Sequence, residues 1–137
     1  MKRIVVSGAV AMFLLATVLA GPAEAHVFVA GTSLSIHKAP TGVTPSGATV
    51  SIYGKLQSPH RSCRVNKLVK LFQVVAGPDT RLAQDRTDGE GTYSFSRQPT
   101  KDMKVYARFS GSLEVSYGHS HECLRSRSSK LLIEVDD

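Results

Sequence analysis

The chain has 137 residues, a formal net charge of +6, 42% hydrophobic residues, two cysteines and no tryptophan. This length favours a single domain, and a charged fraction of 20% with ordinary apolar content excludes a disordered polyelectrolyte. Two cysteines are too few for a cysteine-dense scaffold or for a four-thiolate zinc site.

The N-terminus is typical of a secretory signal peptide. A short basic region precedes an apolar run over residues 4–20, and Ala23-Glu24-Ala25 matches a small-x-small cleavage site. We therefore predict a signal peptide over 1–25, cleavage after Ala25, and a secreted domain over 26–137 without an integral membrane anchor. The alternative is an uncleaved anchor, because about 17 apolar residues can just span a bilayer. Cleavage removes two basic residues and one acidic residue, so the net charge falls from +6 to about +5.

Export would place Cys63 and Cys123 in an oxidising compartment, where a disulfide between them is the simplest interpretation. Such a bridge closes a loop of about 60 residues, for which the chain-entropy model gives roughly 4 kcal/mol of stabilisation. The alternative, two free thiols or a metal pair, has neither C-x-x-C spacing nor a suitable compartment. We predict that the bridge staples a core of modest size.

The secreted part reads as all-β. No segment has a convincing helical period, and short runs of β-branched and aromatic residues alternate with turn residues. About seven short strands at this spacing predict an antiparallel two-sheet Greek-key sandwich. In chain order the predicted strands cover 32–38, 48–57, 67–75, 81–87, 92–96, 103–109 and 130–135, with a possible short extension over 113–117.

Three segments allow finer predictions. The strand over 67–75 is apolar on both faces and is expected at the centre of a sheet, whereas the polar strand over 81–87 is expected at an edge. Asp88-Gly89-Glu90-Gly91 predicts a hairpin turn, because its glycines permit positive φ. A calcium loop at Asp88 and Glu90 is the alternative, but further oxygen ligands are missing.

Residues 50–106 resemble the transthyretin-like sandwich of carboxypeptidase regulatory-like and Cna-B-type domains. The resemblance rests on an apolar strand that reaches a glycine, a second alternating strand, and a Thr-Asp-x-x-Gly-x-aromatic-x-aromatic motif. The matching residues are Val50, Ile52, Gly54, Val69, Leu71, Thr87, Asp88, Gly91, Tyr93 and Phe95.

The resemblance has implications for fold and function. Two cysteines around such a core are similar to those of small exported actinobacterial proteins. The chain departs from the family at 101–106, where a Gly-x-Tyr usually precedes the next strand. The resemblance implies a transthyretin-like sandwich, with an immunoglobulin-like one as the alternative. It also implies an accessory, spacing or ligand-holding role without catalytic residues.

Basic residues flank both cysteines. If the bridge forms, its neighbours converge, because bridged α-carbons lie about 5.5 Å apart. We therefore predict an anion-binding surface for a cell-surface polymer, a lipid headgroup or an acidic protein. The alternative is a solvated loop region, and nucleic acid is not an expected partner because no aromatic residues are interleaved. The four candidate residues are Arg61, Arg64, Arg125 and Arg127.

Histidines near the cysteines form a second candidate site. His60, His119 and His121 could converge on copper or zinc, although the nearby arginines oppose a cation. Separately, His26 would become the first residue after cleavage and could bind copper through its amine and imidazole, with His37, His119 or His121 as partner. This N-terminal arrangement resembles those of CopC-like copper carriers and polysaccharide monooxygenases. The alternative is that the histidines are exposed loop residues.

Motifs for catalysis are missing from the sequence. It has no G-x-S-x-G elbow, no H-E-x-x-H and no glycine-rich phosphate loop. We therefore expect a secreted, non-catalytic binding or structural module without a cofactor, whose ligand could be anionic. The alternative is a copper- or zinc-binding carrier, and the oligomeric state stays open.

Overall fold

The computed structural model describes residues 26–136, so the predicted signal peptide lies outside the described residues. Within this range the chain is all-β, with fourteen strands, one short 3₁₀ helix (η1, Arg61–Cys63) and no α-helix. The strands are β1 (Val27–Ala30), β2 (Ser33–Leu34), β3 (His37–Ala39), β4 (Thr44–Pro45), β5 (Val50–Gln57), β6 (Leu68–Gln73), β7 (Thr80–Arg86), β8 (Thr92–Arg97), β9 (Met103–Phe109), β10 (Ser112–Ser116), β11 (His119–Cys123), β12 (Ser126–Arg127), β13 (Leu131–Ile133) and β14 (Val135–Asp136).

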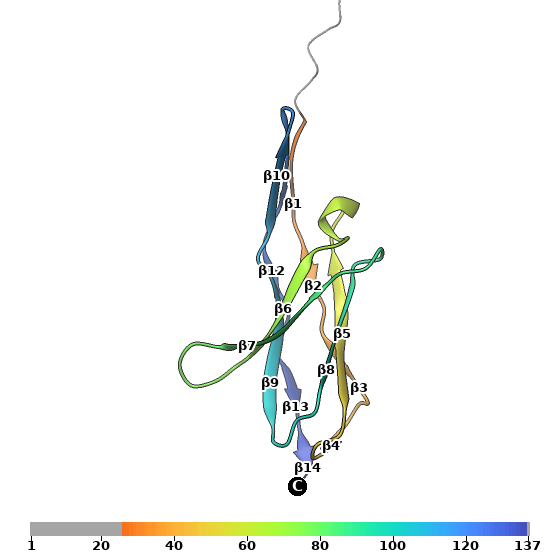
Figure 1. The fold of residues 1–137 in the computed structure, drawn as a ribbon, viewed down its shortest axis with the longest axis vertical. Helices are drawn as coiled ribbons and strands as arrows, with labels where there is room; N and C mark the ends of the chain where they lie inside the picture. The colour runs from red at the N-terminus through yellow and green to blue at the C-terminus, as the bar shows by residue number, and fades with distance from the viewer. Residues whose placement is uncertain (1–25, 137) are drawn as a thin grey trace, which may run out of the picture.

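Two antiparallel sheets make up the body of the molecule (Figure 1). In one sheet, β5 pairs with β8 on one side and with β2 and β3 on the other. In the other sheet, β9 lies between β6 and the short strands β12 and β13, and β7 is at the edge. These groupings correspond to the A-B-E and G-F-C-C′ strands of immunoglobulin-type sandwiches. The predicted Greek-key sandwich is therefore confirmed.

The core lies between these two sheets. Alternate residues of each strand point inward, as the period of two in the sequence predicted. Apolar side chains from β5 and β8 meet those from β6, β9 and β13. The central core residues are Val50, Ile52, Leu56, Val69, Leu71, Tyr93, Phe95, Val105, Ala107, Phe109 and Ile133.

A buried tyrosine interrupts the predicted first strand. The Tyr93 hydroxyl donates a hydrogen bond to the Ser35 carbonyl, so 32–38 divides into β2 and β3. Gly54 makes this approach possible, because a Cβ there would clash with the Ser35 backbone. Leu34 and Ile36 are both buried. Burial raises the pKa of Tyr93 far above its ordinary value, so the hydroxyl stays a donor.

The turn at 88–91 does not form a hairpin, and that prediction is wrong. β7 pairs with β6 and β8 pairs with β5, so the turn carries the chain from one sheet to the other. The reason is that the Leu56 N–H donates to the Gly91 carbonyl (2.8 Å), which holds the turn against β5. Gly91 has φ +85°. The backbone N–H groups of Thr92 and Glu90 lower the pKa of the Asp88 carboxylate.

Beyond the sandwich, β1, β11 and β10 form a three-stranded sheet that we call the arm (Figure 1). β10 and β11 are antiparallel, but β1 runs parallel to β11. A second parallel pair, β4 and β14, lies at the opposite end. Both parallel pairs lie outside the antiparallel sandwich, and β1 and β11 were not among the predicted strands. Within 26–136, no helix is long and apolar enough to cross a membrane.

The central and edge positions were predicted correctly. β6 lies between β9 and β7, and β7 pairs on one side only. β10, predicted as a short extension of the preceding strand, belongs instead to the arm.

Candidate functional site

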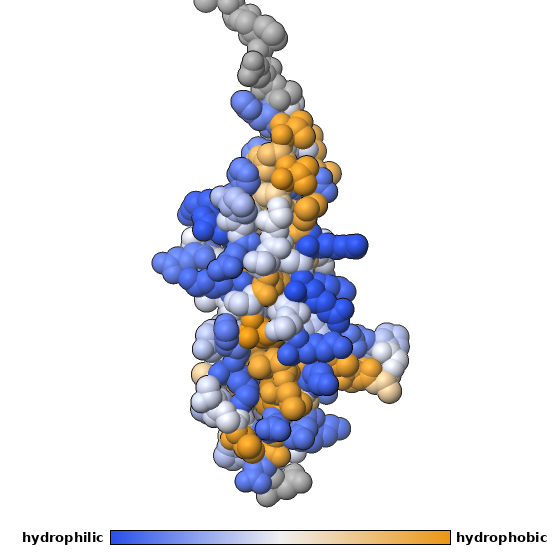
Figure 2. Space-filling model, turned by 180° about the vertical axis from the view of Figure 1, so that it is seen from behind, coloured by the Kyte–Doolittle hydropathy of each residue, from blue (hydrophilic) through white to orange (hydrophobic). Residues whose placement is uncertain are grey.

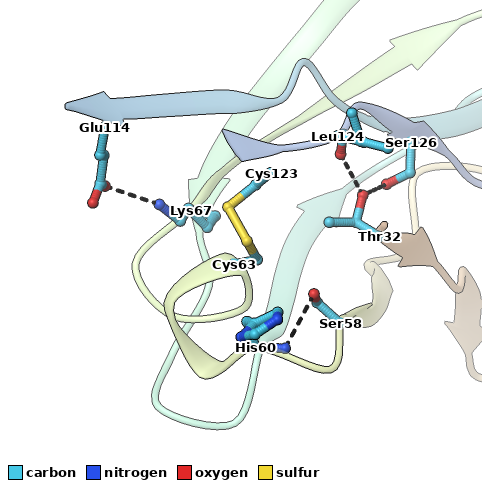
Figure 3. Close-up of a disulfide and its surroundings, with 9 residues drawn as sticks. All are labelled: Thr32, Ser58, His60, Cys63, Lys67, Glu114, Cys123, Leu124 and Ser126. Carbon is cyan, nitrogen blue, oxygen red and sulfur yellow. Dashed lines mark hydrogen bonds and ion pairs between the residues drawn. A yellow bond between two sulfur atoms is a disulfide. The ribbon is translucent and has the colours of Figure 1, made fainter. Parts of the chain in front are cut away.

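The predicted disulfide is confirmed. Cys63 and Cys123 are bonded with their α-carbons 5.5 Å apart, and the bridge fastens η1 to β11 (Figure 3). Lys67 pairs with Glu114 at 3.2 Å on one side of the bridge. Disulfides are rare in the cytoplasm, so the bridge supports a location outside it.

The histidines beside the bridge do not converge on one point. The Phe28 ring stacks on His60 (4.1 Å between centroids) and contacts His121 (4.3 Å), so it separates the two imidazoles. Among residues 26–136, no three His, Cys, Asp or Glu side chains lie close enough to hold a metal ion. Among the described residues the three predicted ligands, His60, His119 and His121, are therefore not gathered into one site, and metal binding by them stays a prediction.

A different pair of histidines does come together. His26 stacks on His119 with 5.3 Å between ring centroids. The parallel pairing of β1 and β11 causes this contact, because the Ser120 N–H donates to the His26 carbonyl (2.9 Å). Of the three predicted partners for His26, the structure selects His119. His37 packs instead against Tyr53 in the sandwich.

The four predicted arginines do not gather around the bridge. Arg61 is exposed on η1, and the half-buried Arg64 uses its carbonyl to accept the Thr87 hydroxyl (2.5 Å). The Nε atom of Arg64 is buried without a hydrogen-bond partner among the described residues. Arg125 and Arg127 line a separate depression of about 470 Å³. The predicted anion-binding surface is thus divided. Arg127 lies on the outer face of the sheet that contains β6, β7, β9, β12 and β13.

Three cations lie side by side across that outer face. In the strand register Arg127 of β12 is opposite Arg108 of β9, and Arg108 is opposite Lys70 of β6. We call these three residues the basic row. Like charges directly opposite each other on adjacent strands are destabilising, so the row costs folding free energy. Arg108 was not a predicted site residue, although the outward alternation of Lys104, Tyr106 and Arg108 is visible in the sequence.

Two stacked aromatic rings support the basic row. Phe72 and Tyr106 stack at 5.5 Å, with Arg108 above Phe72 (4.3 Å) and Arg127 above Tyr106 (3.7 Å). Cation–π contacts of this kind offset part of the repulsion. Aromatic residues therefore do lie among the cations, contrary to the sequence interpretation. Phe72 and Tyr106 are only 8% and 3% exposed, and a guanidinium group lies over each ring.

Asp79 joins this arrangement from the loop between β6 and β7. Its carboxylate accepts the Tyr106 hydroxyl (2.7 Å) and lies 3.6 Å from Arg127. Burial, and then the hydrogen bond to Asp79, raise the pKa of Tyr106. Arg127 thus has a carboxylate partner, whereas the structure gives Arg108 and Lys70 no ion pair among the described residues.

The surface next to the basic row is also basic. The depression that Arg108, Arg125 and Arg127 line contains no carboxylate. A second depression, of about 350 Å³, shares Phe109 and Ser110 with the first and is lined by Lys67, Lys70 and Arg86, with Glu114 as its carboxylate. Six cations and one carboxylate therefore surround the two depressions.

No protein-family model matches the chain, and a search of curated proteins finds no match to it. The transthyretin-like relationship therefore stays a prediction.

Proposed function

We propose that this protein is a secreted, non-catalytic module that binds an anionic polymer at the cell exterior through the basic row. The observation that carries the proposal is the register of Arg127, Arg108 and Lys70 on three adjacent strands. The repulsion within the row is a cost in the free protein. An anionic chain laid across the strands would relieve that repulsion and gain charge-assisted hydrogen bonds.

The spacing favours a polymer over a small anion. Adjacent strands lie about 4.8 Å apart, so the row presents three charges over a span that a repeating phosphate or carboxylate chain can follow. The two basic depressions extend the positive surface beyond the row. Two cation–π contacts hold the guanidinium groups in place, so less side-chain entropy is lost on binding.

The test is titration with polyphosphate of protein recovered from an exporting host, with polyglutamate as the carboxylate counterpart. We expect salt-sensitive binding that falls at least tenfold in the triple variant Lys70→Gln, Arg108→Gln, Arg127→Gln, because the row supplies the contacts. The matched control is Lys55→Gln, Lys101→Gln, Lys130→Gln, which removes the same charge from exposed sites elsewhere. An equal loss in both variants would mean that only net charge matters and would overturn the proposal.

A second candidate function rests on the contact between His26 and His119. If cleavage follows Ala25, the new α-amine, the His26 imidazole and the His119 imidazole supply three nitrogen ligands that suit copper. We expect the processed protein to bind Cu²⁺ and to lose that affinity when one alanine precedes His26 or in His119→Ala. His37→Ala is the control, because His37 packs elsewhere. Unchanged copper affinity in the extended protein would exclude this site, and competition with Zn²⁺ would show which metal the site prefers.

A further inference from the structure

The two faces of the arm differ sharply. One face is covered, because Phe28 and His121 pack with His60 and Cys123 is bonded to Cys63 of η1. The strand register places a different set of residues on the other face, which we call the apolar face. It consists of one row, Val27, Ser120 and Val115, and a second row, Val29, Glu122 and Leu113.

The apolar face is exposed to an unusual degree. Its aliphatic side chains are 70% (Val27), 57% (Val29), 64% (Leu113) and 69% (Val115) exposed. Figure 2 shows hydrophobic side chains gathered at this end of the molecule. Single exposed aliphatic residues are ordinary, but four neighbours on one sheet face are typical of an interaction site.

The two rows of the apolar face complement each other. We propose that a second copy of this chain docks on it, so that the apolar faces of the two arms meet. The two-fold axis that relates the copies lies between the two arms and runs perpendicular to the direction of β11. This axis exchanges the rows, so Val27 meets Val29 of the other copy and Val115 meets its Leu113. Ser120 then meets Glu122 of the other copy. Aliphatic groups lie on aliphatic groups, and each hydroxyl lies on a carboxylate that can accept its hydrogen bond.

Glu122 argues against other occupants. It is the single charged side chain among the six residues of the face. A lipid bilayer would bury this carboxylate with no partner, which is costly. A two-fold axis along the strands would place the two Glu122 side chains against each other. The perpendicular axis instead places Ser120 of each copy against Glu122 of the other copy.

The expected affinity is modest. Six residues from each copy make a small interface beside the roughly 20–30 residues a side of a standard complex, so we expect a weak and reversible dimer. We therefore propose a dimer whose population changes within the concentration range of ordinary sedimentation experiments.

Sedimentation equilibrium of the exported protein tests the dimer. We expect a monomer–dimer equilibrium that Val115→Arg abolishes, because the row exchange would bury two new charges. Val43→Arg is the matched control, since Val43 is 56% exposed and lies outside the arm. Circular dichroism checks that both variants fold. A wild-type protein that stays monomeric at all concentrations overturns the proposal, as does equal dimerisation of wild type and Val115→Arg.

A charge substitution tests the orientation of the two copies. Ser120→Lys would place an ammonium group opposite Glu122 of the other copy at two symmetric points, so we expect at least tenfold tighter dimerisation. Adding Glu122→Lys to this variant should abolish the dimer. Weaker dimerisation of Ser120→Lys would contradict the row exchange. Co-sedimentation of monomeric wild type with phosphatidylcholine vesicles would assign the face to lipid and overturn the proposal.

Discussion

The basic row and the apolar face are both flat sheet surfaces, yet their side chains are opposite in kind. The row places Arg127, Arg108 and Lys70 next to one another, whereas the apolar face has one carboxylate, Glu122, among four aliphatic residues. Each arrangement is unfavourable in isolation, one through repulsion and the other through exposed apolar area. The two surfaces therefore need different partners: salt should weaken binding at the basic row and should have little effect on binding at the apolar face.

The two surfaces also depend on different parts of the structure. The basic row lies on a sheet whose inner side is the main core. The arm lies outside that sandwich and is fastened by the disulfide and by the contacts of Phe28. Substitutions can therefore disturb one surface without the other.

The largest effect is expected when the bridge is removed. In Cys63→Ala, Cys123→Ala the free energy of unfolding should fall by about 4 kcal/mol, because the unfolded chain regains the entropy of an open loop of this length. Urea denaturation measures the loss, and hydrogen exchange should show the amides of β11 opening first. A loss of less than about 1 kcal/mol would show that the bridge contributes little to the fold.

A smaller effect is expected on the covered face of the arm. Phe28→Ala removes a half-buried ring between two imidazoles and should cost about 2 kcal/mol of unfolding free energy. Polyphosphate binding should not change, because the ring of Phe28 packs against His60 and His121 and against no residue of the basic row. Leu132→Ala, at a 48% exposed residue, is the control for stability. Equal losses of stability and of polyphosphate affinity would mean that the two surfaces are not separable.

Relief of repulsion in the row should act in the opposite direction. Lys70→Gln should raise the free energy of unfolding by about 0.5 kcal/mol, because Lys70 lies opposite Arg108. Lys104→Gln is the control on the same sheet, since Leu132 lies opposite it. The gain should shrink as salt is added. If Lys70→Gln destabilises the protein at low salt, the row is not a source of repulsion.

The smallest effect concerns the pKa of Tyr106. Burial is the main cause that raises this pKa, and the hydrogen bond to Asp79 adds to it. In Asp79→Asn the carboxylate charge disappears, so the pKa should fall but stay above the ordinary value of about 10. Ultraviolet absorbance during a pH titration measures it, with Asp102→Asn as the control. An unchanged pKa would show that Asp79 does not affect the Tyr106 hydroxyl.

The fold was largely predictable from local patterns. Strong alternation in 48–57 and 103–109 gave β5 and β9, and two cysteines allowed a single pairing. The arm was not predictable, because His119–Cys123 is mostly polar and its parallel partner β1 is about ninety residues away. No local pattern contains such a pairing.

The candidate sites could not be predicted fully either, because they too depend on contacts between distant parts of the chain. Of the basic row only Arg127 was a predicted site residue, since the row appears only when the register of β12, β9 and β6 is known. The predicted histidine trio does not converge, because the Phe28 ring packs against both His60 and His121, which residue spacing cannot reveal.

The parallel pairing of β1 with β11 also bears on the order of folding. β1 is the first strand of the described chain, but its partner is complete only at Cys123, the residue that also closes the disulfide. A chain that emerges from its N-terminus must therefore keep β1 unpaired until nearly all of the sandwich has appeared. The arm therefore assembles late, and the disulfide can form only after β11 has emerged, when just the short strands β12, β13 and β14 are still to come.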